Sequence, residues 1–398
     1  MVTYEKRSSE LYTGHEQSFV KHTVLEEYLL EFALKVGDYC PSITYVDGFS
    51  GPWKAQSEKL EDTSFYIALA KLRQARATLK KRAKQLKLRC FFIEADPTAY
   101  GRLKAFADLP ENNDVEIVTS NSEFEHAISY VLKFVRDGGQ TFPFFFIDPT
   151  GWTGFAMKTI RPILQLSPSE VLVNFMTGHI RRFIEAPEQI RQDEFRDLFG
   201  SDEFRELPPD LFGQEREDRI VQTYMKSLGQ TGTFKYVCAA IVLNPKKDAT
   251  HFHLIYATRH WKGVEVFKKT ERKAMEVQEK LHAEAQQRLR ENRDGQGELF
   301  GATVLAKTSH YDSLRDRYRS AAHSLVESRL TQDGSLDYDQ AWIMTQLHPL
   351  VWVSDLKKWI ETWQAEKRLR VDGLVGKERV PQFGKRHRLV WLEVSHRS

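Results

Sequence analysis

The chain has 398 residues, of which 41% are hydrophobic and 28% are charged, and its formal net charge is +3. This length is too great for one ordinary core, so we expect a folded protein of two or three domains. The first 18 residues contain no apolar leader, and no apolar run approaches the ~18 residues of a membrane span. We therefore expect a cytoplasmic protein with no membrane partner.

The cysteines and paired histidines do not suggest a metal centre. Cys40, Cys90 and Cys238 are far apart and form no Cys-x-x-Cys pair, which predicts small buried thiols in a reducing compartment. His251 and His253 share one strand face, but no acid or cysteine stands near them at ligand spacing. Ordinary strand packing is the favoured interpretation, and no metal site is predicted.

The first 175 residues alternate between short apolar runs and helical patterns. Strands this continuously apolar are buried on both faces, which predicts a parallel sheet covered by helices. The expected strands are 43–47, 90–94, 115–118, 142–147 and 170–175, and the expected helices are 16–36, 62–88, one that opens at 97, 123–136 and 157–166.

Beyond this point the pattern changes to a helical insert of about 178–230, followed by two β-rich runs at 234–243 and 251–257. A hairpin-like turn joins these runs, so we interpret them as an antiparallel pair that completes the same sheet. The predicted fold class is α/β, with a Rossmann-like seven-stranded methyltransferase sheet. The expected helices of the insert are 178–199 and 215–228.

The remainder predicts a second domain. A long charged helix at 262–293 is broken by Gly295 and Gly297, which mark a linker, so the first domain is expected to span 1–297. Residues 303–398 have the pattern of three helices and a basic hairpin, the plan of a winged-helix domain. Its expected elements are helices at 311–329, 338–348 and 353–366, and a hairpin at 369–394.

The strand at 43–47 ends in an acid and runs into a glycine-rich turn, Asp47-Gly48-Phe49-Ser50-Gly51. Glycine lacks a Cβ, so such a turn lets a ligand approach the backbone, and the acid suits the amino group of a methionine moiety. The predicted cofactor-binding residues here are Asp47, Gly48, Phe49 and Gly51. The alternative is a strand-to-helix turn that binds nothing.

Two further cofactor residues are predicted at the next strand ends. Glu94 ends the second strand, where an acid can accept hydrogen bonds from both ribose hydroxyls. Asn121 follows the third strand and could pair with the adenine edge. The alternatives are a loop acid at Glu94 and a helix N-cap at Asn121, while Asp96 is expected to cap the helix that opens at Pro97.

The fourth strand ends in Asp148-Pro149-Thr150-Gly151-Trp152. An acid and a proline followed by an aromatic residue resemble the catalytic loop of N-methyltransferases that act on bases. In such a loop the acid orients the target amine, and the aromatic ring stacks on the base. Asp148, Pro149 and Trp152 are therefore the predicted catalytic residues, and the alternative is a turn with a packing tryptophan.

Four runs together resemble the three-Cys-motif partner protein (TcmP) family over about residues 21–268: 45–52, 92–97, 146–152 and 171–176. The resemblance implies a methyltransferase-like fold, and S-adenosylmethionine is the predicted cofactor. It also implies a separate, radical-SAM-like partner protein whose cysteines give the family its name. Family members often carry a winged helix, which fits the tail.

Positive charge is concentrated at the end of the chain, where residues 354–398 hold eleven basic and six acidic side chains. A winged helix meets DNA through its third helix and wing, so nucleic acid is the expected partner, DNA before RNA. The alternative for the tail is a protein partner. The alternative for Arg181 and Arg182 is a solvated helix face. The predicted nucleic-acid-binding residues are Arg181, Arg182, Lys357, Lys358, Arg368, Arg370, Lys385, Arg386 and Arg388.

Three functions fit these observations. The first is an S-adenosylmethionine-dependent methyltransferase that modifies nucleic acid, with Asp148 orienting an exocyclic amine. The second is a non-catalytic subunit that presents nucleic acid to a radical-SAM-like protein. The third is a metal-dependent nuclease that uses Asp47, Glu94 and Asp148, which all end neighbouring strands of the predicted sheet.

Overall fold

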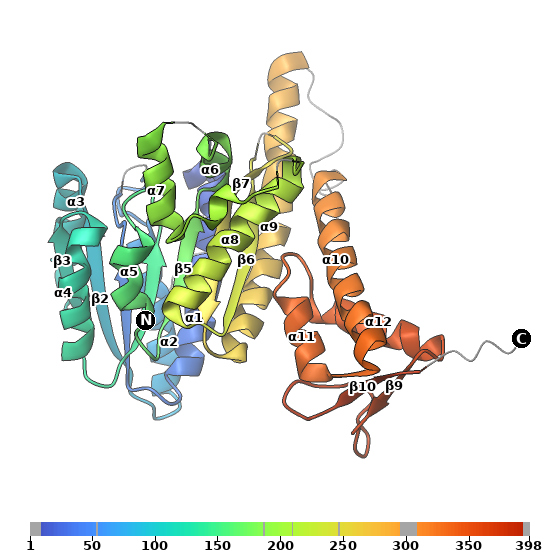
Figure 1. Cartoon of the computed structure of the whole chain (residues 1–398). Helices are drawn as coiled ribbons and strands as arrows, with labels where there is room; N and C mark the ends of the chain where they lie inside the picture. Colours follow the sequence, from blue (N-terminus) through green and yellow to red (C-terminus); the bar gives the residue numbers. More distant parts are fainter. Residues whose placement is uncertain are drawn as a thin grey trace, which may run out of the picture. The chain divides into compact units, whose positions relative to one another are not determined.

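The computed structural model describes residues 9–52, 55–185, 188–208, 210–245, 247–294 and 309–392. It divides the chain into two compact units, Met1–Ala302 and Thr303–Ser398 (Figure 1). The predicted linker glycines, Gly295 and Gly297, and the end of the predicted hairpin, 393–394, lie outside the described residues.

A seven-stranded sheet forms the centre of the first unit, in the order β3-β2-β1-β4-β5-β7-β6. Strands β1 to β5 are parallel, and β7 runs antiparallel to both β5 and β6. This arrangement confirms the predicted sheet with an antiparallel pair at its end. The strands are β1 (Ser42–Asp47), β2 (Lys87–Glu94), β3 (Glu116–Asn121), β4 (Phe142–Ile147), β5 (Glu170–Phe175), β6 (Tyr236–Leu243) and β7 (Thr250–Thr258).

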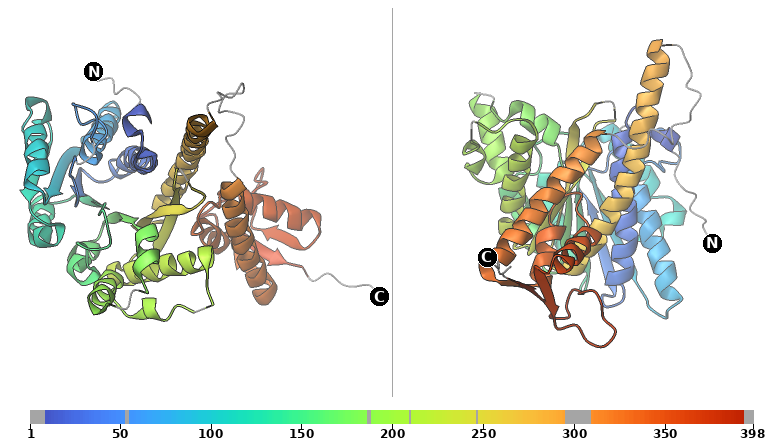
Figure 2. Two further views of the ribbon diagram at one scale, coloured as in Figure 1. Left: turned by 90° about the horizontal axis from the view of Figure 1, so that it is seen from above. Right: turned by 90° about the vertical axis from the view of Figure 1, so that its right-hand side faces the viewer.

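Helices cover both faces of this sheet (Figure 2). On one face α1 (Glu16–Val36) packs against α2 (Ser64–Lys80) and α9 (Trp261–Asp294), and on the other α5 (Met157–Leu164) packs against α4 (Phe124–Asp137) and α8 (Gly213–Gly232). The remaining helices of this unit are α3 (Pro97–Ala107), α6 (Thr177–Phe183), α7 (Gln189–Phe199) and the short 3-10 helices η1 (Ser9–Tyr12), η2 (Pro110–Asn112) and η3 (Glu203–Arg205).

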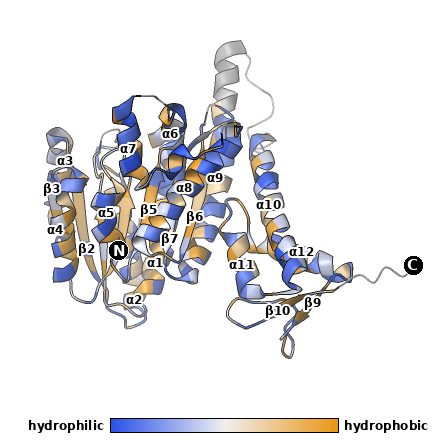
Figure 3. Ribbon diagram, in the orientation of Figure 1, coloured by the Kyte–Doolittle hydropathy of each residue, from blue (hydrophilic) through white to orange (hydrophobic). Residues whose placement is uncertain are grey.

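Alternate strand residues supply the two layers of the core. Phe145 and its neighbours on one side pack with α4, α5 and α8. Phe144, the next residue, lies against Tyr28 of α1 on the other side, with ring centroids 5.6 Å apart. The apolar strands are therefore enclosed by helices whose outer surfaces are hydrophilic (Figure 3).

Two helical predictions are corrected. The helix expected at 62–88 ends at Lys80, because Ala83 adopts a left-handed φ of 57° and β2 already begins at Lys87. The single helix expected at 178–199 is instead the two helices α6 and α7. The sequence carries a proline between them, which cannot donate a helical hydrogen bond.

The second unit has the element order helix, strand, two helices, two strands. Its three strands form an antiparallel sheet in the order β8-β10-β9, and buried tryptophans such as Trp359 and Trp363 fill its core. The three helices and the closing hairpin were predicted, whereas the three-residue β8 was not. The elements are α10 (Ser309–Asp333), β8 (Ser335–Asp337), α11 (Tyr338–Gln346), α12 (Val353–Ala365), β9 (Leu369–Asp372) and β10 (Arg388–Trp391).

Two further findings concern the chain as a whole. Cys40, Cys90 and Cys238 are buried thiols, as the sequence predicted. Within the described residues, no helix combines the length and the apolar character that crossing a membrane requires.

Candidate functional site

The carboxyl ends of β1 to β5 meet at one edge of the sheet, because these strands are parallel. Asp47 lies opposite Phe92 and Phe146 in the strand register, and Glu94 lies opposite Asn121. Four of the residues that the sequence singled out, Asp47, Glu94, Asn121 and Asp148, are thus gathered at or just beyond one edge. This is the edge at which open α/β sheets bind ligands.

The first turn is held together by its own hydrogen bonds. The Asp47 carboxylate is fully buried, and its Oδ1 accepts the Phe49 N–H at 3.1 Å. Ser50 donates from its hydroxyl to the Asp47 carbonyl and from its N–H to the Ile93 carbonyl, at 3.0 and 2.8 Å. Burial raises the pKa of Asp47 to about 6, although hydrogen bonds from Ser64 and Phe49 lower it. Asp47 is therefore buried below the turn and stabilises it through the hydrogen bond from the Phe49 backbone.

Gly48 is required by packing. A Cβ at this position would lie 2.8 Å from the Phe124 ring, closer than side-chain contacts allow. The ring of Phe49 also lies against Phe124, with centroids 5.5 Å apart, and Gly51 is half-buried at the end of the turn. The packing of Phe124 accounts for a glycine at position 48 even if no ligand binds there. The cofactor roles of Gly48, Phe49 and Gly51 therefore stay predictions.

Glu94 and Asn121 both bind the backbone at the end of β2. Glu94 is buried, and its Oε1 accepts the N–H of Asp96 at 2.7 Å. The amide of Asn121 donates to the carbonyls of Glu94 and Ala95 at 2.9 and 3.1 Å. The N-cap alternative for Asn121 is wrong, since Glu123 occupies the N-cap position of α4. Asp96 caps α3 as predicted, its Oδ1 accepting the Ala99 N–H at 2.7 Å.

Asp148 has two partners that the sequence analysis did not identify. Lys21 of α1 donates to its Oδ2 at 2.5 Å, and Asn174, near the end of β5, donates to its Oδ1 at 2.7 Å. The side chains of Lys21 and Asp148 are 13% and 12% exposed, so this ion pair is largely shielded from water. Asn174 is one of two polar residues in β5, the other being Glu170, and no local pattern in the sequence connects it to Asp148.

Two further residues of the fourth-strand loop, Pro149 and Trp152, pack against the protein interior. Pro149 is buried, and the indole N–H of Trp152 donates to Glu194 at 2.9 Å. The Trp152 ring lies against Phe183 and Phe195 of the insert, with centroids 5.3 and 5.5 Å apart. Trp152 thus joins the loop to the insert, and its stacking on a base stays a prediction.

Arg181 and His253 each have a buried polar partner near α6. Arg181 is exposed but pairs with the fully buried Glu217 at 3.0 Å, and Arg182 is also exposed. His253 is buried with its Nδ1 2.7 Å from the Thr177 hydroxyl, and burial lowers its pKa. Across the described ranges, no group of three or more His, Cys, Asp or Glu side chains is arranged to hold a metal ion.

The predicted nucleic-acid residues of the second unit divide by charge pairing. Arg368 pairs with Glu327 and Glu366, at 2.6 and 3.2 Å. Arg370 binds both carboxylate oxygens of Asp372, at 2.6 and 3.0 Å.

The other cations of this unit are less constrained. Arg388 donates to the Ser335 hydroxyl at 2.8 and 3.1 Å, and Lys385 lies 3.9 Å from Glu378. Lys357 is half-buried, whereas Lys358 and Arg386 are exposed. None of these last three forms an ion pair with any residue that the structure describes.

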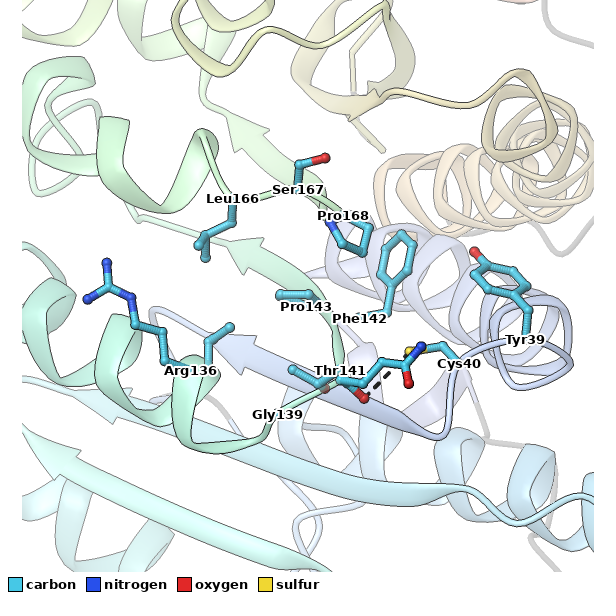
Figure 4. Close-up of a pocket in the computed structure, with 12 residues that line it drawn as sticks. Tyr39, Cys40, Arg136, Gly139, Thr141, Phe142, Pro143, Leu166, Ser167 and Pro168 are labelled. Carbon is cyan, nitrogen blue, oxygen red and sulfur yellow. Dashed lines mark hydrogen bonds between the residues drawn. The ribbon is translucent and has the colours of Figure 1, made fainter.

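A pocket of about 390 Å³ lies at the opposite, amino-terminal edge of the sheet (Figure 4). Cys40 precedes β1, Thr141 precedes β4 and Pro168 precedes β5, and all three line it. Arg136 and the exposed Tyr39 stand at its sides. None of the predicted cofactor or catalytic residues reaches this pocket.

Comparisons of the sequence with models of known families and with curated proteins found no match. Among solved structures, a loganic acid methyltransferase with SAH is similar to this chain at 9% identity. The match covers 72% of this chain and 92% of that one, with a TM-score of 0.30. A similarity this distant carries no conclusion about activity, so the functional argument rests on the geometry of the sheet edge.

Proposed function

We propose that this chain is an S-adenosylmethionine-dependent methyltransferase that modifies a base amine of nucleic acid. The observation that carries the proposal is the strand order β3-β2-β1-β4-β5-β7-β6, with Glu94 and Asp148 at the carboxyl ends of β2 and β4. A cofactor lying across the ends of β1 and β2 would have Glu94 beside its ribose. Asp148 would stand beyond β4, on the side where an acceptor enters.

Each residue then has a defined task. The Glu94 carboxylate accepts hydrogen bonds from a vicinal diol, and Asn121 holds the turn on which Glu94 sits. Asp148 accepts a hydrogen bond from the target amine and fixes the direction of its lone pair. S-adenosylmethionine, when bound, supplies an electrophilic methyl group. Orientation by fixed acceptors is the contribution that the protein makes to the reaction.

The second unit supplies the nucleic-acid contact in this proposal. Its order of helices and hairpin is compatible with the winged helix expected from the sequence, and Lys358 and Arg386, which form no ion pair among the described residues, would offer their charge to phosphates. DNA is the proposed substrate before RNA, and a radical-SAM-like three-Cys-motif protein is the proposed partner. The first follows from the basic winged-helix pattern of the tail, and the second from the sequence resemblance.

A second function is favoured by one observation. Asp47, Glu94 and Asn121 already make hydrogen bonds within the chain, as they would in a fold retained without its cofactor. On this alternative the chain delivers nucleic acid to a partner and transfers no methyl group. The metal-dependent nuclease has no comparable support.

Titration calorimetry with S-adenosylmethionine separates the two functions. We expect micromolar affinity for the wild type, and a loss of about 1.5–3 kcal/mol, or roughly 10- to 150-fold, for Glu94→Ala. Glu123→Ala is the matched control. Glu123 is an exposed acid beside the same sheet edge, and its side chain makes no capping hydrogen bond to α4. No binding by a folded wild type would favour the non-catalytic function, and unchanged affinity in Glu94→Ala would remove Glu94 from the cofactor site.

A further inference from the structure

The Asn174 side chain has one partnered end and one unpartnered end. A carboxylate only accepts hydrogen bonds, so the contact of 2.7 Å with Asp148 Oδ1 must come from the amide nitrogen of Asn174. The same nitrogen lies 3.5 Å from the Met176 sulfur. The amide oxygen therefore faces elsewhere, and it is buried without a hydrogen-bond partner.

A lone buried acceptor is costly, and native proteins retain one mainly where a ligand or water completes it. Asn174 is 3% exposed and stands near the carboxyl end of β5, next to Asp148 beyond β4. The two atoms of an amide belong to one planar group, so its oxygen lies close to the same strand end. The missing partner must be a donor, because a carbonyl oxygen cannot donate.

Lys21 sets the charge that such a donor can carry. Its ammonium group lies 2.5 Å from Asp148 Oδ2 in a largely shielded ion pair. A second cation brought to the same carboxylate would meet this charge at close range with little water between them, which is unfavourable. A neutral donor does not meet that barrier.

We propose that Asp148 and Asn174 together form a two-acceptor site for an uncharged amino group, which Lys21 guards against protonated amines. A neutral –NH₂ carries two N–H donors, one for each acceptor, as on adenine, cytosine or guanine. Thymine carries no amino group, and an aliphatic amine is protonated at neutral pH. The inference rests on the proposed function and narrows its substrate class. Asp148 and Asn174 contact the amine in it, whereas Lys21 is a positioning residue that acts through Asp148.

The substrate side is tested with the full-length wild type. Labelled methyl transfer from S-adenosylmethionine is measured to single-stranded oligo(dA), oligo(dC), oligo(dG) and oligo(dT), and to polylysine. We expect label on one or more of the amino-bearing homopolymers and none on oligo(dT) or polylysine. Label on oligo(dT) or polylysine at a comparable rate would overturn the two-acceptor site.

The variant Asn174→Leu tests the unpartnered acceptor by its stability, without reference to any substrate. Asn112 is the matched control, because it is also 3% exposed but uses both ends of its amide, with Phe106 and Arg73. We expect Asn112→Leu to lower the melting temperature by several degrees, and Asn174→Leu to leave it unchanged or raise it. A fall in Asn174→Leu as large as in Asn112→Leu would make Asn174 a structural residue and overturn the inference.

The two measurements together separate the inference from the proposed function. If the wild type transfers no methyl group to any probe, the proposed function fails, and the melting temperatures still decide the role of Asn174. If transfer occurs, Asn174→Leu should reduce it about tenfold or more, while S-adenosylmethionine binds within about twofold of the wild-type affinity.

Lys21→Met gives an independent check. We expect a fall in kcat of about tenfold with little change in the KM for S-adenosylmethionine, and partial rescue in Lys21→Arg. Lys71→Met is the control, since Lys71 forms an ion pair of similar exposure with Glu26 at 2.6 Å. Equal kcat values in the two methionine variants would remove Lys21 from the site.

Discussion

Strand β5 carries one buried polar side chain near each end, Glu170 and Asn174, and the two differ in how they are satisfied. Glu170 accepts the Tyr28 hydroxyl on Oε2 at 2.6 Å and the Thr258 hydroxyl on Oε1 at 2.8 Å. The backbone of Gly263 closes over this cluster, where a Cβ would lie 2.8 Å from Oε1. Asn174 has a donor contact to Asp148 and an acceptor without a partner.

Burial alone does not separate these residues, since Glu170 is 5% exposed and Asn174 is 3% exposed. A complete set of hydrogen bonds identifies a group that holds the fold together, because nothing remains for a ligand to add. A half-complete set at the carboxyl edge identifies a group that a ligand can complete. The polar residue at the amino-terminal end of β5 is thus structural, and we place the methyl-transfer site at the carboxyl end of this strand.

The largest effect is expected at Asp148, the partner of Asn174. Asp148→Ala should lower the rate of methyl transfer by about 10²–10³, or about 2.7–4 kcal/mol, because the variant has no fixed carboxylate acceptor for the amine. S-adenosylmethionine affinity should change little. The measurement is labelled transfer to the homopolymers, with Asp114→Ala as the control acid, which pairs with Arg73 and Arg76 away from this edge. Wild-type rates in Asp148→Ala would place it with Glu170 as a structural residue.

Asp47 lies at the carboxyl edge of the sheet, like Asn174, but its carboxylate accepts hydrogen bonds within the chain, like that of Glu170. Burial raises its pKa in the folded protein from 3.8 to about 6, so the folded state binds a proton that the unfolded state has already released. Stability should therefore fall as pH rises from about 4 to about 6, by about 3 kcal/mol at most. Denaturant unfolding across this range should show the fall in the wild type and not in Asp47→Asn. The same slope in both proteins would contradict this assignment.

Glu170→Leu tests the structural end of β5. The change removes the carboxylate that accepts the buried Thr258 hydroxyl at 2.8 Å, leaving only the His260 carbonyl at 3.5 Å, and should cost about 1–3 kcal/mol of unfolding free energy. Tyr28 keeps a contact of 2.5 Å with the Tyr256 hydroxyl, which limits the destabilisation. Chemical denaturation measures the effect, while cofactor affinity should stay at the wild-type value. A variant as stable as the wild type would break the contrast with Asn174.

The sheet could be predicted from the sequence because its strands are continuous apolar runs that end in polar residues. Strands β4 and β5 match their expected bounds, 142–147 and 170–175, to the residue. The end of α2 could not be found in this way, since a left-handed residue at Ala83 has no marker in a basic run. The three-residue β8 is too short to show a period.

The site could be predicted only in part, for a different reason. Asp148 could be identified because it follows a strand directly, and parallel strands bring such residues to one edge. Its partners could not, since Lys21 and Asn174 are 127 and 26 positions away along the chain. Which side chains meet across that distance depends on how α1 and β5 pack, and no local pattern records it.

The smallest effect is expected for the basic residues of the second unit, which also divide into those with a partner in the chain and those without one among the described residues. Arg370 donates from Nε and Nη2 to the two carboxylate oxygens of Asp372, so the pair brings no net charge to a phosphate. The exposed Arg386 has no ion pair among the described residues. Removing one cation that neutralises a phosphate should reduce the slope of log affinity against log salt by about 0.9 for duplex DNA. We therefore expect Arg386→Gln in the full chain to lower the slope by roughly that amount, measured by fluorescence anisotropy between low and moderate salt. The charge-neutral double variant Arg370→Gln/Asp372→Asn should leave the slope unchanged. A double variant that lowers the slope as much as Arg386→Gln would show that paired cations also reach the phosphates, and a wild type with no salt dependence would assign this unit to a protein partner.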